Sequence, residues 1–121
     1  MAFAGKNPFK IARQLWSVGG FDKQTLAGDL TLTHKDSQMI GLDPGGSNRT
    51  ITLPAPVNGA WFAIFNLADA AEDLVIEHAD GSTTMTTANR NECAIVYALD
   101  DKASDAADGW DVLAIVTISP S

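Results

Sequence analysis

The chain of 121 residues has one cysteine, Cys93, and this scarcity excludes two kinds of stabilisation. A single thiol cannot form a disulfide within the chain, and it cannot supply a cysteine-based metal cluster. The sequence also lacks a run of about 18 apolar residues, the length that a membrane helix needs. Residues 1–16 contain no continuous apolar core of the kind found in a secretion signal. We therefore expect a soluble protein that assembles in a reducing compartment and contacts no membrane.

Basic residues are scarce, and they are unevenly distributed. The chain has 8 Lys and Arg against 15 Asp and Glu, which gives a net charge of −7. Because contacts to phosphate need a basic surface, this balance argues against direct binding of nucleic acid. Residues 1–24 nevertheless hold four basic side chains against one acidic one, whereas residues 25–121 hold four against 14.

This distribution predicts two parts, a basic and aromatic N-terminal arm (1–24) and an acidic β-sandwich domain (25–121). Aromatic side chains are common anchors of interfaces, so we expect the arm to dock onto an acidic partner, although an incidental tail is the alternative. A short helix could form over residues 8–18, beginning at Pro8 and ending before Gly19. The candidate contact residues of the arm are Phe3, Lys6, Phe9, Lys10, Arg13, Leu15, Trp16 and Phe21.

From Leu30 onward, short apolar or alternating segments are separated by turn-forming residues. The predicted strands are 30–34, 37–42, 49–53, 60–66, 73–79, 82–87, 92–99 and 110–118. The turns between them include DPGGSN at 43–48, Asn58–Gly59 and Asp80–Gly81. About eight strands at this spacing predict an all-β fold, an antiparallel β-sandwich or jelly roll.

Residue types that carry out catalysis are present, but they do not form catalytic patterns. His34 and His78 lie on different predicted strands and belong to no spaced pair, so we expect positions at the surface or at a strand edge. Cys93 begins an apolar strand, which favours a small buried residue over a nucleophile. Because serine-nucleophile motifs are also absent, we expect no enzymatic activity.

Two segments resemble ligand-binding loops only in composition. Residues 41–46 are rich in glycine but lack the Lys and the Ser or Thr of a phosphate-binding loop. The acidic residues between Asp100 and Asp111 depart from the spacing of a calcium-binding loop, so they predict a solvated connection. We therefore predict no cofactor and no metal site.

One strand has more apolar residues than a single core can cover. Trp61, Phe62, Ile64 and Phe65 lie within five positions, so both faces of this strand must be covered. The core would cover one face, and the other would pack under a loop or form the interface of a symmetric homo-oligomer. Trp61, Phe62 and Phe65 are accordingly candidates for the subunit interface or the core.

Five sequence motifs follow one another between residue 48 and residue 110. The motifs are NRTITLP (48–54), GAWFAIFN (59–66), DLVIEHADG (73–81), ECAIVYAL (92–99) and DGW (108–110). In this order they resemble the small β-rich modules of tailed-bacteriophage virions, especially capsid decoration (cement) proteins and related head- or tail-fibre domains. The resemblance covers residues 30–118.

The resemblance implies a homotrimer on the outer capsid, made in the host cytoplasm, which clamps neighbouring major capsid proteins. The arm is then the candidate for contact with the capsid, an assignment that rests on its charge and aromatic content. Two other functions remain open, a head- or tail-fibre (spike) module and a carbohydrate-binding sandwich used in host adhesion. The latter would use an exposed tryptophan, for which Trp110 between Asp108 and Asp111 is the candidate.

Overall fold

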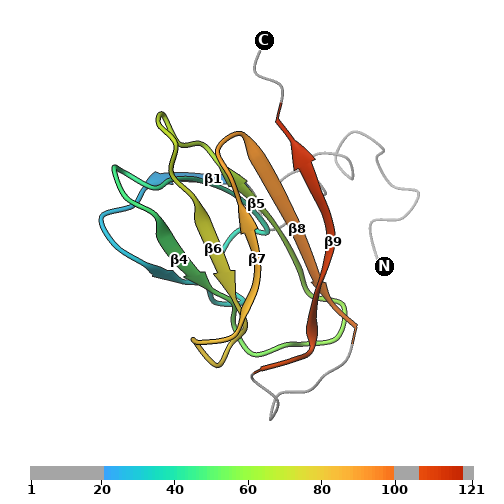
Figure 1. Cartoon of the computed structure of the whole chain (residues 1–121). Helices are drawn as coiled ribbons and strands as arrows, with labels where there is room; N and C mark the ends of the chain where they lie inside the picture. The colour runs from blue at the N-terminus through green and yellow to red at the C-terminus, as the bar shows by residue number, and fades with distance from the viewer. Residues whose placement is uncertain (1–20, 100–106, 119–121) are drawn as a thin grey trace, which may run out of the picture.

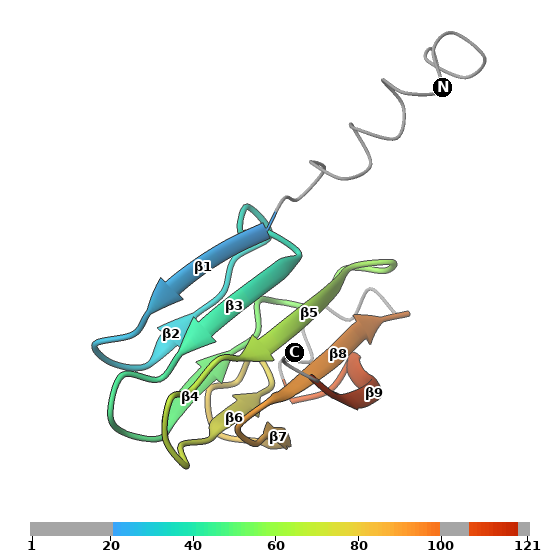
Figure 2. The ribbon, with the colours of Figure 1, turned by 90° about the horizontal axis from the view of Figure 1, so that it is seen from above.

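The computed structural model describes residues 21–99 and 107–118, which form strands joined by turns and loops. The strands are β1 (Phe21–Thr25), β2 (Leu30–Thr31), β3 (Met39–Asp43), β4 (Arg49–Thr52), β5 (Trp61–Asn66), β6 (Leu74–Glu77), β7 (Thr84–Ala88), β8 (Glu92–Ala98) and β9 (Trp110–Thr117). They form two sheets that face each other across one apolar core (Figures 1 and 2). Within these ranges there is no helix long and apolar enough to cross a membrane.

The first six strands alternate between the two sheets. β1, β3 and β5 are parallel neighbours in a five-stranded sheet, and β2, β4 and β6 are parallel neighbours in a four-stranded sheet. Two consecutive strands therefore make one turn of a coil, and three such turns stack side by side. Figure 2 shows this stacking from above, with β1, β3 and β5 lying over β2, β4 and β6.

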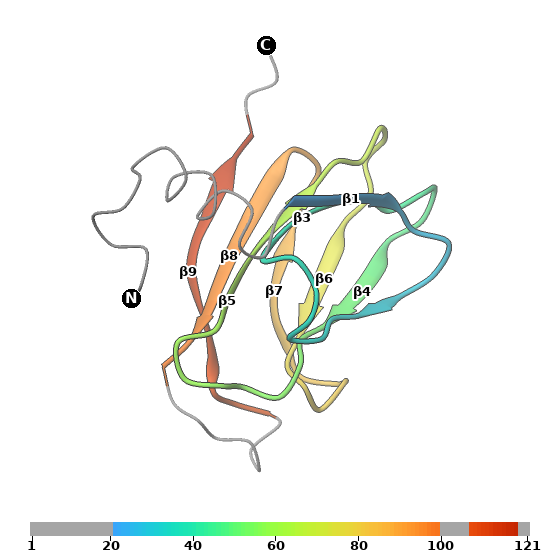
Figure 3. The same cartoon turned by 180° about the vertical axis from the view of Figure 1, so that it is seen from behind.

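The last three strands complete the sheets in antiparallel fashion. β7 pairs with β6, while β8 and β9 extend the other sheet beyond β5. The sheet orders are β1-β3-β5-β8-β9 and β2-β4-β6-β7, and Figures 1 and 3 show them from opposite sides.

These observations confirm an all-β, two-sheet fold but correct its topology. Four of the seven strand pairings are parallel, so the expected antiparallel arrangement is wrong. Each of the eight predicted strands contains one observed strand or most of it, and β1 is an additional ninth. Because β1 pairs with β3 from Phe21 to Thr25, it crosses the expected boundary between the arm and the domain. The predicted helix at 8–18 lies outside the described residues.

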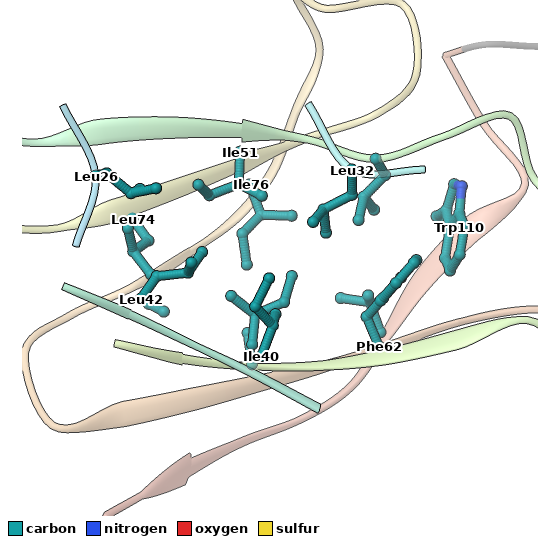
Figure 4. Close-up of a cluster of buried hydrophobic side chains, with 14 of the residues drawn as sticks. Leu26, Leu32, Ile40, Leu42, Ile51, Phe62, Leu74, Ile76 and Trp110 are labelled. Carbon is teal, nitrogen blue, oxygen red and sulfur yellow. The ribbon is translucent and has the colours of Figure 1, made fainter. Parts of the chain in front are cut away.

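Successive turns of the coil place apolar residues beside one another, and this alignment builds the core. Leu30, Ile51 and Ile76 are in register across the four-stranded sheet, and Ile40, Ile64 and Ala94 are in register across the five-stranded sheet. Figure 4 shows the side chains of the core meeting between the two sheets. Trp110 fills the end of this core, where its ring lies 5.8 Å from that of Phe62 and its Nε1 donates a hydrogen bond to the Pro54 carbonyl.

At the end of β5, a buried asparagine occupies a core position whose aligned residue on β3 is apolar. Asn66 is aligned with Leu42 and is completely inaccessible to solvent. Its side-chain nitrogen donates hydrogen bonds to the carbonyls of Glu72 and Ala88, and its side-chain oxygen accepts one from the Ala68 N–H. Asn66 therefore attaches the β5–β6 loop and the end of β7 to the end of β5.

Candidate functional site

The outer face of the five-stranded sheet carries apolar side chains from one edge strand to the other. Strand pairing aligns Phe21, Met39, Ala63, Ile95 and Ala114 in one row and Gly41, Phe65, Cys93 and Val116 in the next. Trp61 and Tyr97 pair beside the first row. We call these residues the apolar face.

Much of the apolar face remains open to solvent. Phe21 is 52% exposed, Val116 46%, Trp61 40% and Met39 39%. Large apolar side chains clustered in this way are typical of surfaces that bind another protein. Among the residues described, the charged side chains on this face lie on the two edge strands or at a strand end: Lys23 on β1 is aligned with Gly41, Asp111 on β9 is aligned with Tyr97, and Asp43 ends β3.

A glycine allows the aromatic part of this face to pack closely. The rings of Phe21 and Phe65 lie 5.7 Å apart on either side of Gly41. A Cβ atom at Gly41 would approach the Leu67 Cδ1 atom to 2.7 Å and the Phe21 Cζ atom to 3.1 Å. The absence of a side chain at Gly41 thus lets Phe21 and Leu67 cover the sheet.

The outer face of the four-stranded sheet is different in character. Thr31, Thr50, Thr52, Val75, Glu77, Thr84 and Thr87 are the paired residues on this face. Threonine is compatible with strands and with water, so this face is suited to solvent. The two outer faces therefore differ, since one is largely apolar and the other is rich in threonine.

The apolar face borders a hollow of about 400 Å³ at the Trp61 end. It is lined by His34, Lys35, Asp36, Gln38, Ala60, Trp61 and Phe62. Protein interfaces commonly combine an apolar centre with a polar rim, and this hollow supplies polar groups next to the Trp61 indole.

The structure separates the three aromatic candidates of β5. Phe62 points inward and is 2% exposed, so it belongs to the core, whereas Trp61 and Phe65 lie on the opposite, apolar face. Phe21 lies on the same face. The other arm candidates, Phe3, Lys6, Phe9, Lys10, Arg13, Leu15 and Trp16, lie outside the described residues.

The side chains considered for chemistry have structural surroundings. Cys93 is buried, as expected, and burial raises the pKa of its thiol to about 11, so it stays protonated at neutral pH. His34 is exposed, as expected, and stacks on Trp110, with its Nε2 2.6 Å from the Ala55 carbonyl oxygen. His78 is buried at the end of β6, which the sequence did not predict.

Trp110 cannot serve as a binding platform for a sugar. It is 1% exposed and packs against Phe62. The tryptophan set proposed for carbohydrate binding therefore does not form.

Several members of the apolar face were not predicted from the sequence, chiefly Met39, Ile95, Tyr97 and Val116. A signal for β8 was present in ECAIVYA, because its alternate residues Cys93, Ile95 and Tyr97 are as apolar as the inward-facing ones between them. Like β5, this strand carries apolar side chains on both faces.

No family model matches the chain, and no curated protein matches its sequence.

Proposed function

We propose that this chain is a structural virion protein, a capsid decoration protein of tailed bacteriophages that binds the outer capsid as a homotrimer and stabilises the shell. The observation that carries the proposal is the apolar face, a wide apolar surface with few charged side chains on an otherwise acidic domain. The order of sequence motifs from residue 48 to residue 110 supports the same assignment.

The occupant of the apolar face is a second copy of this chain. A protein with net charge −7 repels itself over most of its surface, so self-association is most favourable where acidic groups are absent. The central strands β3 and β5 offer such a region around Met39, Ala63 and Phe65. Burial of an aromatic side chain contributes about 1.5–3 kcal/mol, so a few of these residues suffice to hold subunits together.

The basic arm is the part that grips the capsid. Its lysines and arginine would orient it on an acidic lattice, and its aromatic residues would supply buried area. In a trimer three arms are linked, so each bound arm raises the effective concentration of the other two. Modest individual contacts then hold firmly, and all must break before the shell opens.

The first experiment measures oligomeric state. In size-exclusion chromatography with light scattering, the full chain should have a mass three times the 12.8 kDa of one subunit. Trp61→Lys and Met39→Lys place a charge on exposed positions of the apolar face and should produce folded monomers. The matched control is Val75→Lys on the outer face of the four-stranded sheet, which should remain trimeric. A monomeric wild-type chain, or trimers that survive both substitutions, would refute this use of the apolar face.

The second experiment tests the arm on undecorated phage shells. Deletion should remove residues 1–20 and retain β1, because a deletion through residue 24 would also remove the strand that pairs with β3. The 21–121 protein should remain trimeric but fail to saturate shells. Saturation by the truncated protein would contradict the role of the arm. A copy number of only a few tens per virion would favour the fibre module instead.

A further inference from the structure

Three carboxylates from separate parts of the sequence meet at one corner of the fold. Asp43 ends β3, whereas Asp69 and Glu72 lie in the loop between β5 and β6. One carboxylate oxygen from each residue lies within 4.8 Å of the other two. This corner lies at the margin of the five-stranded sheet, next to the end of β1.

The backbone holds the three residues in place. β3 and β5 run parallel, and the Leu67 N–H continues their pairing by donating to the Leu42 carbonyl at 2.8 Å. The loop that follows Leu67 is therefore fixed beside Asp43. Asn66 holds the same loop from inside through its hydrogen bonds to Glu72 and Ala68. Hydrogen bonds thus hold the end of β3 and the β5–β6 loop beside each other.

Among residues 21–99 and 107–118, no Lys or Arg forms an ion pair with the cluster. Glu72 is only 9% exposed, and its Oε1 atom is buried without a hydrogen-bond partner among the described residues. Arg90 reaches the loop, but its Nε donates to the Ala68 carbonyl at 3.2 Å. Lys23 lines the same hollow as Asp43, and no ion pair joins it to the described carboxylates. Burial of an unpaired carboxylate is costly, as is repulsion between neighbouring carboxylates.

We propose that Asp43, Asp69 and Glu72 bind a divalent cation, with Ca²⁺ as the preferred ion. Calcium binds carboxylate oxygens at about 2.3–2.6 Å, so two ligands on opposite sides of the ion are about 4.8 Å apart. The oxygens of this cluster fit within that span. Asp43 uses Oδ1 to accept the Gly45 N–H, which leaves its other oxygen for the ion. An adjoining hollow of about 440 Å³, lined by Lys23, Gln24, Thr25, Asp43 and Leu67, offers a path from solvent and room for water ligands.

The ion would join β3 to the β5–β6 loop and give the Glu72 carboxylate, whose Oε1 has no hydrogen-bond partner within the described ranges, a ligand to bind. This proposal is independent of the virion role, because it concerns the folded domain alone. Calcium suits the cluster better than magnesium, since calcium accepts irregular oxygen geometry whereas magnesium needs a near-ideal octahedron.

The test compares thermal unfolding of the full chain in EDTA and in CaCl₂ at constant ionic strength. A ligand that binds only the folded state raises Tm, and at 100 times its Kd the rise should be on the order of 10 °C. Glu72→Gln keeps the size of the side chain and removes its charge. Glu77→Gln is the matched control, because Glu77 lies on β6 away from the cluster.

The expected result is a crossover. In EDTA the E72Q variant should unfold at a temperature at least as high as wild type, because carboxylate repulsion is relieved. In CaCl₂ the Tm of wild type and of E77Q should exceed the Tm of E72Q. Titration calorimetry should give one calcium site for wild type and none for E72Q. MgCl₂ should give a smaller rise than CaCl₂. The proposal is overturned if calcium leaves the wild-type Tm unchanged, or if wild type and E72Q respond alike.

Discussion

Replacement of Asn66 by alanine should be among the most destabilising single changes in this domain. The Asn66 side chain forms three hydrogen bonds, at 2.8 Å to the Glu72 carbonyl, 2.9 Å to the Ala88 carbonyl and 2.9 Å from the Ala68 N–H. The residue has no exposed surface, and Ala68 and Ala88 are buried as well. Asn66→Ala therefore removes the side-chain partner of three backbone groups in a region that water reaches poorly.

The magnitude follows from the cost of buried polar groups. Each unsatisfied group costs about 1–3 kcal/mol, and partial entry of water into the vacated space lowers the sum. We expect a loss of about 3–5 kcal/mol, a large part of the roughly 5–15 kcal/mol that stabilises a domain of this size. Urea unfolding followed by tryptophan fluorescence should show the midpoint falling by about 2 M.

The control is Asn58→Ala, which removes the same side chain from an exposed turn where it forms no hydrogen bond with the described part of the chain. Its effect should stay within about 0.5 kcal/mol. Asn66→Asp provides a second check, because the carboxylate can still accept from Ala68 but cannot donate to the two carbonyls. At neutral pH it should destabilise at least as much as alanine. An N66A loss comparable to that of N58A would refute the reasoning.

Two further predictions concern turns. Gly45→Ala should cost more stability than Gly46→Ala. Both residues have positive φ angles, 76° and 104°, but only at Gly45 would the new Cβ collide with a backbone atom, the Leu26 carbonyl oxygen. Urea unfolding of the two variants measures the difference, and equal losses of stability would contradict the prediction. The Thr83 hydroxyl, followed by the Ser82 and Thr83 N–H groups, lowers the pKa of Asp80 from 3.8 to about 2. Since a lowered carboxyl pKa stabilises the fold above pH 3.8, this contribution to stability should disappear as pH falls towards 2. Thr83→Val should move the titration midpoint of Asp80 towards 3.8, as measured by NMR. An unchanged midpoint would exclude the Thr83 hydroxyl as the cause.

Strands were predictable from the sequence where their pattern was local. β4, β6 and β8 combine apolar residues at alternate positions with clear turns on either side, so they were found within a few residues of their ends. β1 was missed because Phe21 is followed by four polar residues, and all five are exposed. This strand exists through its pairing with β3, which depends on residues 18 positions away.

Strand direction was not predictable from the same signals. The segment Asp43–Pro44–Gly45–Gly46 has the composition of a hairpin turn, yet here it leads from β3 in one sheet to β4 in the other. A turn between sheets and a turn within a sheet both need glycine and proline, so local composition does not distinguish them. Without that distinction, the alternation of strands between the sheets could not be inferred.

The carboxylate cluster was missed for a related reason. Acidic residues that are close together in the chain are visible in the sequence, and the stretch from Asp100 to Asp111 is such a group. The proposed ligands Asp43 and Glu72 are far apart in sequence and meet because β3 and β5 are parallel neighbours. Proximity of this kind becomes visible only when the pairing of the strands is known.

The same stacking of turns accounts for both candidate sites. Parallel strands in register place equivalent positions side by side, so apolar residues at outward positions of β1, β3 and β5 merge into one face, which the antiparallel strand β8 extends. At the ends of the strands the connections also lie side by side, but they differ in length, since residues 44–48 join β3 to β4 and residues 67–73 join β5 to β6. The longer connection has more backbone groups to satisfy, and Asn66 replaces the apolar residue found at Leu42 to hold it. The hydrogen bond from Asn66 to the Glu72 carbonyl holds Glu72 close to Asp43. The buried asparagine and the acidic cluster are therefore both consequences of one long connection.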